Sequence, residues 1–78
     1  MEERIRQIAA SVLRVSPARL DPAASPDTIG TWDSLQHLNL VLALEETFDL
    51  RFTVEDVGRM RNLGEVVRLV RSRLDGGA

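Results

Sequence analysis

A serine stands where a predicted helix begins, in the segment Gly30-Thr31-Trp32-Asp33-Ser34-Leu35. The first backbone N–H groups of a helix have no partner within the helix, and the helix dipole is positive at that end. A phosphate on the Ser34 oxygen would therefore be stabilised, so the chemistry best suited to this position is phosphoester formation. Asp33 and Ser34 are also favoured N-cap residues, and on position alone a purely structural role as caps stays open.

Three other groupings of residues are candidates for function. Ser34 and His37 lie three positions apart on one predicted helix, but the sequence suggests neither an oxyanion hole nor the orienting group that a nucleophile–base pair needs. The acidic residues from Glu45 to Asp56 match no calcium loop, so a solvated surface is the preferred interpretation and no metal site is predicted. Trp32 is either an anchor for a partner or a lid over the preceding loop, and the burial of its side chain would distinguish the two.

The composition excludes several classes of protein. The chain has 78 residues, enough for one domain over 1–78, and its 44% hydrophobic and 28% charged residues are typical of a folded chain. A formal charge of −2 excludes a broadly basic nucleic-acid binder. No apolar run approaches the roughly 20 residues of a membrane span, and no signal peptide is visible, so we expect a cytoplasmic protein. The chain contains no cysteine. Its short length favours a module that other proteins act on, and disfavours an enzyme.

The hydrophobic pattern predicts an all-α fold, a four-helix bundle with three longer helices and a short third helix. The first helix is predicted over residues 1–15, and Ser16-Pro17 ends it because proline disfavours a helical conformation in the residue before it. A long loop over 16–32 then connects the first and second helices. Leu20 and Ile29 are the residues expected to fix this loop to the core.

The second helix is predicted from Asp33 or Ser34 to about Phe48. Its apolar positions cover more of the circumference than the ~100° stripe of a plain surface helix. One part of this wide apolar face must turn to the core, and the rest forms an apolar edge beside a polar strip. The edge comprises Leu35, Leu38 and Leu42, and the strip comprises Gln36, Asn39 and Glu46.

The remaining elements are short. Residues 48–52 are interpreted as an extended connector, and Thr53-Val54-Glu55-Asp56 has the form of a capping box for a helix that ends near Met60. Asn62-Leu63-Gly64-Glu65 offers a second box for a final helix that Gly76-Gly77 ends. The predicted core comprises Ile5, Ile8, Val12, Leu40, Val41, Leu44, Phe48, Val66, Val67 and Val70.

Taken together, these features resemble the acyl and peptidyl carrier protein family. Asp33-Ser34-Leu35 stands at a helix start, the leucine-rich helix ends in Leu44-Glu45-Glu46-Thr47-Phe48-Asp49, and a capped short helix and a fourth amphipathic helix follow. In that family the serine receives 4′-phosphopantetheine from coenzyme A through a phosphopantetheinyl transferase, and the thiol of this arm carries acyl or aminoacyl groups as thioesters. The resemblance covers nearly the whole chain. It implies a carrier that is not itself an enzyme, with Ser34, between Asp33 and Leu35, as the attachment site.

The resemblance also implies a docking surface on the second helix and its flanks. Partners would be an adenylating or acyl-transferring loading enzyme and downstream synthase enzymes. Gln36 and Asn39 are neutral where fatty-acid carriers tend to be acidic, and Trp32 precedes the triplet; both favour a discrete carrier of a polyketide-like or nonribosomal-peptide-like pathway. The residues expected to contact partners are Gln36, Leu38, Asn39, Leu42, Glu45, Glu46 and Asp56.

Two alternatives stay open: a small helical interaction module in which Ser34 is only a cap, and a housekeeping carrier of fatty-acid synthesis. A monomer is expected for the family, with no nucleic-acid or membrane partner. In a carrier, a cleft between the second and third helices would shelter a short acyl chain. The residues expected to line that cleft are Leu38, Val41, Leu42 and Met60.

Overall fold

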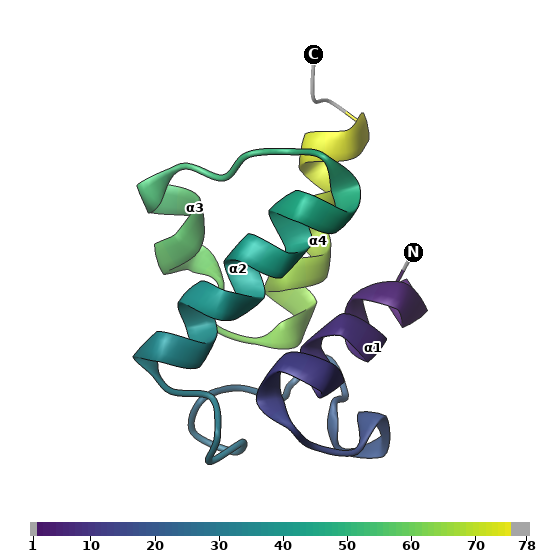
Figure 1. The fold of residues 1–78 in the computed structure, drawn as a ribbon, viewed down its shortest axis with the longest axis vertical. Helices are drawn as coiled ribbons and strands as arrows, with labels where there is room; N and C mark the ends of the chain where they lie inside the picture. Colours follow the sequence, from purple (N-terminus) through teal and green to yellow (C-terminus); the bar gives the residue numbers. More distant parts are fainter. Residues whose placement is uncertain (1, 76–78) are drawn as a thin grey trace.

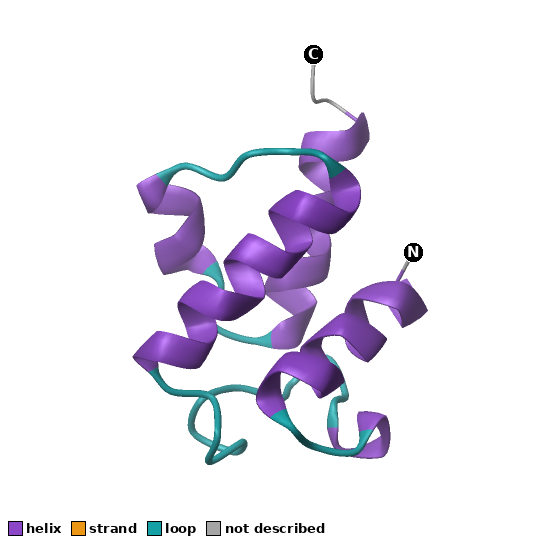
Figure 2. Cartoon of the chain, viewed as in Figure 1, coloured by secondary structure: helices purple, strands orange, loops and turns teal. Residues whose placement is uncertain are grey.

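The computed structural model describes residues 2–75, which form four α-helices (Figures 1 and 2). Helix α1 spans Glu2–Leu13, α2 spans Ser34–Phe48, α3 spans Val54–Arg59 and α4 spans Leu63–Asp75. The described part of the chain contains no strand. The predicted all-α bundle, with a long first loop and a short third helix, is therefore confirmed.

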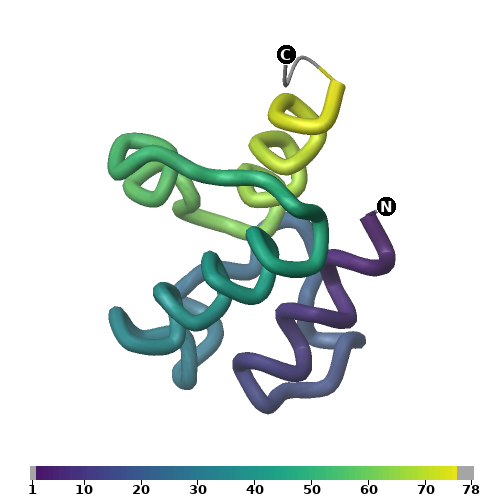
Figure 3. The backbone as a smooth tube through the Cα atoms, turned by 45° about the horizontal axis from the view of Figure 1, so that its top comes forward, coloured from purple at the N-terminus to yellow at the C-terminus, as the bar shows by residue number. Residues whose placement is uncertain are grey.

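The contacts between the helices are concentrated on α1 and α4. Helix α1 contacts both α2 and α4, and α3 contacts α4. The segment between α2 and α3 leads from the end of α2 to the side of the bundle away from α1 (Figures 1 and 3). Of the predicted connector over 48–52, Phe48 still belongs to α2, and residues 49–52 form neither helix nor strand. The predicted end of α4 at Gly76-Gly77 lies outside the described residues.

Helices α1 and α2 end in the same way, on a residue with left-handed backbone conformation. Arg14 has a φ of 58°, and the N–H of Val15 donates to the carbonyl of Ala10 at 3.2 Å. This closure stops α1 at Leu13, before the predicted end at Ser16-Pro17. In α2 the equivalent residue is Asp49, with a φ of 53°.

The loop between α1 and α2 is fixed to the core by a few of its side chains, while most of its residues are exposed. It contains one turn of 3-10 helix, Pro17–Arg19. Leu20 and Ile29 are buried, as predicted, and Ala24 and Trp32 are buried with them. The burial of four apolar side chains explains how so long a connection holds one conformation in so small a protein.

The same loop supplies hydrogen-bond acceptors to the start of α4. The N–H groups of Leu63 and Gly64 donate to the carbonyls of Ala24 and Pro22, each at 2.9 Å. The side chain of Asn62 accepts from the next free N–H, that of Glu65, at 2.8 Å, so this half of the second predicted capping box forms. A Cβ at position 64 would lie 3.2 Å from the Pro22 carbonyl oxygen, so a larger residue there would require the loop backbone to shift by a few tenths of an ångström.

Seven of the ten predicted core residues are buried, and the observed core contains further residues, among them Ala9, Leu13 and Leu63, that were not predicted as core. Ile8, Val12 and Phe48 are only partly buried against it, and the other predicted core residues are buried. Ala10, which is not among the predicted core residues, is also buried. The reason is that α1 packs against α2, the 3-10 turn and α4 together, so its buried face is wider than a single stripe.

Candidate functional site

Ser34 is the first residue of α2, and its side chain is exposed. The N-cap is Asp33, whose carboxylate accepts a hydrogen bond from the N–H of Gln36 at 2.8 Å. Within residues 2–75 the Ser34 hydroxyl has no hydrogen-bond partner. Of the two residues that the sequence offered as caps, Asp33 fills the role, and the hydroxyl of Ser34 is left available for reaction.

The residues before Ser34 hold it in place. The Thr31 hydroxyl donates to the carbonyl of Leu13 at the end of α1, and the N–H of Asp33 donates to the carbonyl of Thr31 at 3.0 Å. The side chain of Trp32 is only 2% exposed. Such burial excludes Trp32 as an exposed anchor for a partner and leaves its second predicted role, that of a lid over the loop.

His37 lies one turn into α2, and both nitrogens of its ring have partners. The indole N–H of Trp32 donates to His37 Nδ1 at 2.9 Å, and His37 Nε2 lies 3.1 Å from the carbonyl oxygen of Val57. The ring therefore has no nitrogen free to accept the proton of Ser34. The Ser34–His37 pair weighed from the sequence is not formed.

An open cavity of about 720 Å³ lies beside Ser34, between the start of α2 and the end of α3. Leu38 and Met60 line it, as predicted, but Val41 and Leu42 do not. Val41 is buried in the core, whereas the side chain of Leu42 is 60% exposed. The prediction was therefore correct about the two helices and wrong about those two residues.

The outer face of α2 is apolar beyond Ser34. Leu35 and Leu38 are 65% and 54% exposed, and Leu42 continues the same edge. Gln36 is half-buried and Asn39 is exposed, and their side chains are joined by a hydrogen bond of 3.3 Å. No acidic residue lies in the first turn of α2. Glu46, nearer the other end, is exposed.

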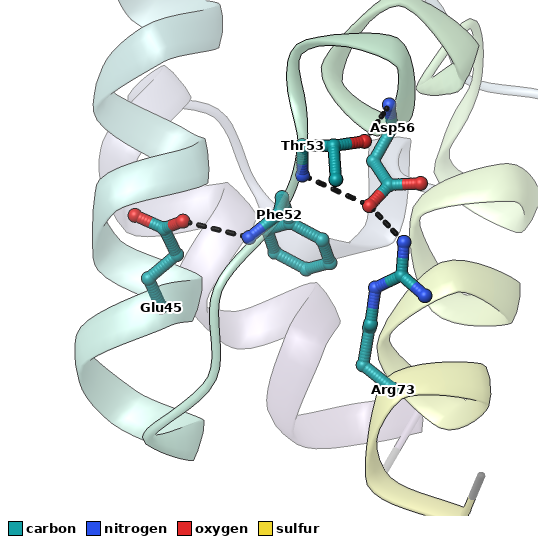
Figure 4. Close-up of polar contacts among 5 residues, drawn as sticks. All are labelled: Glu45, Phe52, Thr53, Asp56 and Arg73. Carbon is teal, nitrogen blue, oxygen red and sulfur yellow. Dashed lines mark hydrogen bonds and ion pairs between the residues drawn. The ribbon is translucent and has the colours of Figure 1, made fainter. Parts of the chain in front are cut away.

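Asp56, predicted to lie on the docking surface, is 2% exposed (Figure 4). Its carboxylate accepts from the N–H of Thr53 at 3.0 Å and is paired with the Arg73 guanidinium of α4, while Thr53 Oγ1 accepts from the N–H of Asp56. These interactions complete the predicted capping box. The Thr53 N–H, followed by Arg73, holds the pKa of the Asp56 carboxyl below its usual range. Asp56 therefore stabilises α3 and presents no charge to a partner.

Glu45 is also used internally. Its side chain is half-buried, and its Oε2 accepts from the N–H of Phe52 at 2.9 Å, which fixes the connector to α2 (Figure 4). Within residues 2–75, no three His, Asp or Glu side chains gather where they could hold a metal ion. The acidic residues of this region that remain on the surface are Glu46, Asp49 and Glu55.

Two contacts in this region had no local signal in the sequence. Arg73 and Asp56 are 17 positions apart, and His37 and Val57 are 20 positions apart. Trp32 and His37 were each singled out in the sequence, but their contact was not predicted. Neither a spacing of five residues nor the two residue types indicates that their rings meet. Both contacts depend on where α3 settles against α2 and α4.

Comparison with known proteins identifies the family. The family described as "Phosphopantetheine attachment site" matches residues 3–70. The chain belongs to this family of carrier proteins. An acyl carrier protein from Phenylobacterium zucineum (strain HLK1) is 33% identical over 73 residues, which are 92% of this chain and 91% of the relative. The solution structure of a holo acyl carrier protein from Geobacter metallireducens matches with a TM-score of 0.87 at 26% identity, over 97% of this chain and 87% of that one.

As an acyl carrier protein family member, the chain is a carrier of a covalent 4′-phosphopantetheine arm and not an enzyme. Phosphopantetheinyl transferases and synthase or transferase enzymes are the partners that the family implies. The start of α2 fits such an arm, because a free, exposed hydroxyl stands at a helix N-terminus beside an open cavity. None of the helices within residues 2–75 is long and apolar enough to cross a membrane.

Proposed function

We propose that Ser34 is the residue to which the 4′-phosphopantetheine arm is attached. The observation that carries this proposal is that Asp33 caps α2, so that the neighbouring Ser34 hydroxyl is exposed and has no partner within the described residues 2–75. The unpaired N–H groups of the first turn favour the negative charge of the phosphodiester. The alternative in which Ser34 is only a cap is disfavoured by the same observation.

In the transfer, Ser34 Oγ forms a bond to the phosphorus that bears pantetheine. The pyrophosphate bond of coenzyme A breaks, adenosine 3′,5′-bisphosphate leaves, and the hydroxyl proton passes to a base of the transferase. Once attached, the arm supplies a terminal thiol that holds acyl or aminoacyl groups as thioesters. This chain contains no cysteine that would compete for those groups.

Partner enzymes are proposed to dock on the α2 face, defined as Leu35, Gln36, Leu38, Asn39, Leu42 and Glu46. This face begins one residue after Ser34, so an enzyme that reaches Ser34 must cover the first turns of α2. Its leucines are more than half exposed, and its first turn has no acidic residue. A complementary partner therefore presents an apolar patch, and docking depends less on salt than docking of an acidic face.

The neutral first turn of α2 supports a role in a specialised-metabolite pathway of polyketide or nonribosomal-peptide type. The loading enzyme would then be an adenylating enzyme or an acyltransferase. We take residues 1–78 as one carrier domain that acts as a monomer in the cytoplasm.

A role in fatty-acid synthesis is the second candidate, favoured by the likeness to a relative named acyl carrier protein. A malonyl transferase of fatty-acid synthesis distinguishes the two, because we expect it to load the holo chain poorly.

The attachment site is tested by measuring intact mass after incubation with coenzyme A and a promiscuous phosphopantetheinyl transferase. Wild-type chain should gain the mass of one phosphopantetheine, and Ser34→Ala should gain none. Ser11→Ala is the matched control, because Ser11 is an exposed serine on α1 and its loss should leave the gain intact. No gain in a folded wild-type chain, or a gain in Ser34→Ala, would overturn the assignment.

A further inference from the structure

The ring of His37 joins three segments that surround Ser34. Trp32, in the long loop, donates its indole N–H to His37 Nδ1, and Val57, in α3, places its carbonyl oxygen at Nε2. The centroids of the two rings are 6.0 Å apart and their planes are inclined by only 25°, as expected for a hydrogen bond that joins two ring edges. One side chain of α2 thus holds both the loop before Ser34 and the third helix.

The hydrogen bonds determine the protonation state of the ring. An indole N–H can only donate, so His37 Nδ1 must present its lone pair. The proton of the neutral ring is then on Nε2, where it is donated to the Val57 carbonyl. That carbonyl also accepts from the N–H of Met60 at 3.3 Å, at the end of α3, and its two lone pairs accommodate both donors.

These contacts lie in the wall of the cavity beside Ser34. Trp32, His37, Val57 and Met60 line it together with Ser34 itself. Among the described residues that line the cavity, only Asp33, from the loop, and Arg61, from the segment after α3, carry a charge. The first end of α3 is held separately, by Asp56 and Arg73. The other end is joined to α2 through His37.

We propose that His37 is a proton-controlled positioning residue, which in its neutral form holds Trp32 and the end of α3 around the cavity. A proton on Nδ1 would set two N–H groups against each other, so the bond to Trp32 must break and the wall must rearrange. This inference rests on the geometry of the unmodified chain and does not depend on Ser34 carrying the arm.

The composition makes the proposal simple to test, because the chain has one histidine and one tryptophan. In a ¹⁵N-labelled chain without the arm, the indole N–H resonance and the ring nitrogens of His37 are followed by NMR from pH 8 to pH 5. We expect the Nε2–H tautomer at pH 8. The indole resonance and the methyl resonances of Leu38 and Met60 should then move with the same midpoint as the ring. The Nδ1–H tautomer, or an indole resonance that ignores the ring titration, would overturn the proposal.

Two variants separate His37 from other titrating groups. In His37→Gln the amide oxygen can still accept from the indole N–H but does not titrate, so the indole resonance should stay constant from pH 8 to pH 5. In His37→Leu both bonds are lost, and the resonance should keep its acidic wild-type position at every pH. Far-UV circular dichroism checks that both variants are helical. A wild-type-like titration in His37→Gln would assign the effect to another group, such as Asp33, and refute the proposal.

Discussion

Helices α2 and α3 both begin with a side-chain oxygen that accepts from the backbone N–H three residues on, yet their surroundings differ. At the start of α2, Asp33 accepts from Gln36, and both Asp33 and Ser34 are exposed. At the start of α3, Thr53 and Asp56 bond reciprocally, and Asp56 is buried against Arg73 (Figure 4). Sequence signals of the same kind thus produce an open, reactive helix start and a closed, structural one.

The difference shows that a helix N-terminus becomes a reactive site only when its cap leaves a neighbouring nucleophile free. At α3 both polar side chains of the capping box, those of Thr53 and Asp56, stabilise the helix. At α2 the single carboxylate of Asp33 stabilises the first turn, and the side chain of Ser34 makes no hydrogen bond to any residue between 2 and 75. Substitutions at the two helix starts should therefore have separate effects on loading and on stability.

The largest expected effect is on loading and comes from Ser34→Ala. The variant should accept no phosphopantetheine, and its free energy of unfolding should stay within about 0.5 kcal/mol of wild type because an exposed side chain without a partner is lost. Urea unfolding of the apo chain measures the stability. A clear loss of stability would show that Ser34 contributes to the cap after all.

The next effect is on stability and comes from Asp56→Ala. We expect a loss of about 2 kcal/mol, because hydrogen bonds from Thr53 and Arg73 to a buried carboxylate disappear. Loading should persist at temperatures where the variant is folded. Glu55→Ala, at an exposed neighbouring acid, is the control and should be close to neutral. An equal loss of unfolding free energy in the two variants would mean that the buried hydrogen bonds of Asp56 do not stabilise the fold.

A smaller effect is expected from Asp33→Ala, which removes the cap of α2. The loss should be about 1 kcal/mol, and Asp33→Asn, which keeps a side-chain oxygen, should recover most of it. Thermal unfolding of the three proteins measures the series. If Asp33→Ala were as stable as wild type, another group, with Ser34 the nearest, would have taken over the cap.

The smallest expected effect is the acid dependence that Asp56 adds to stability. Its pKa is lowered in the folded chain, so the unfolded chain binds a proton more readily, and stability from this group falls as the pH falls. This contribution is complete above the unfolded pKa of about 3.9 and is lost as the pH drops through the folded pKa. The free energy of unfolding, measured in urea between pH 7 and pH 3, should therefore fall less with decreasing pH in Asp56→Asn than in the wild type. Parallel curves would contradict the assignment.

Local signals were enough to predict the helices and Ser34, because caps and periodicity act within a few residues. Asp33, Thr53 and Asn62 each cap the helix that the sequence predicted for them. The use of Asp56 was not predictable, since an acid in a capping box can equally well face solvent. Its partner Arg73 comes from another helix, and only packing brings the two together.

The same limit explains the errors at the cavity. Val41 is buried in the core and Leu42 is exposed on the edge, as predicted, but neither lines the cavity, because the part of the wide apolar face that borders α3 depends on the rotation of α2 against its neighbours. The residues that line the cavity instead include Trp32 and Val57, from segments on either side of α2 in the chain.

The hydrogen bonds from Leu63 and Gly64 to the long loop have a consequence for how the molecule opens. These two amides belong to α4, but their acceptors, Ala24 and Pro22, belong to the loop that leads to Ser34. Hydrogen–deuterium exchange at Leu63 and Gly64 should therefore report opening of the loop, not fraying of α4 alone. The loop and the first turn of α4 should exchange together as one cooperative unit, although some forty residues separate them in the chain.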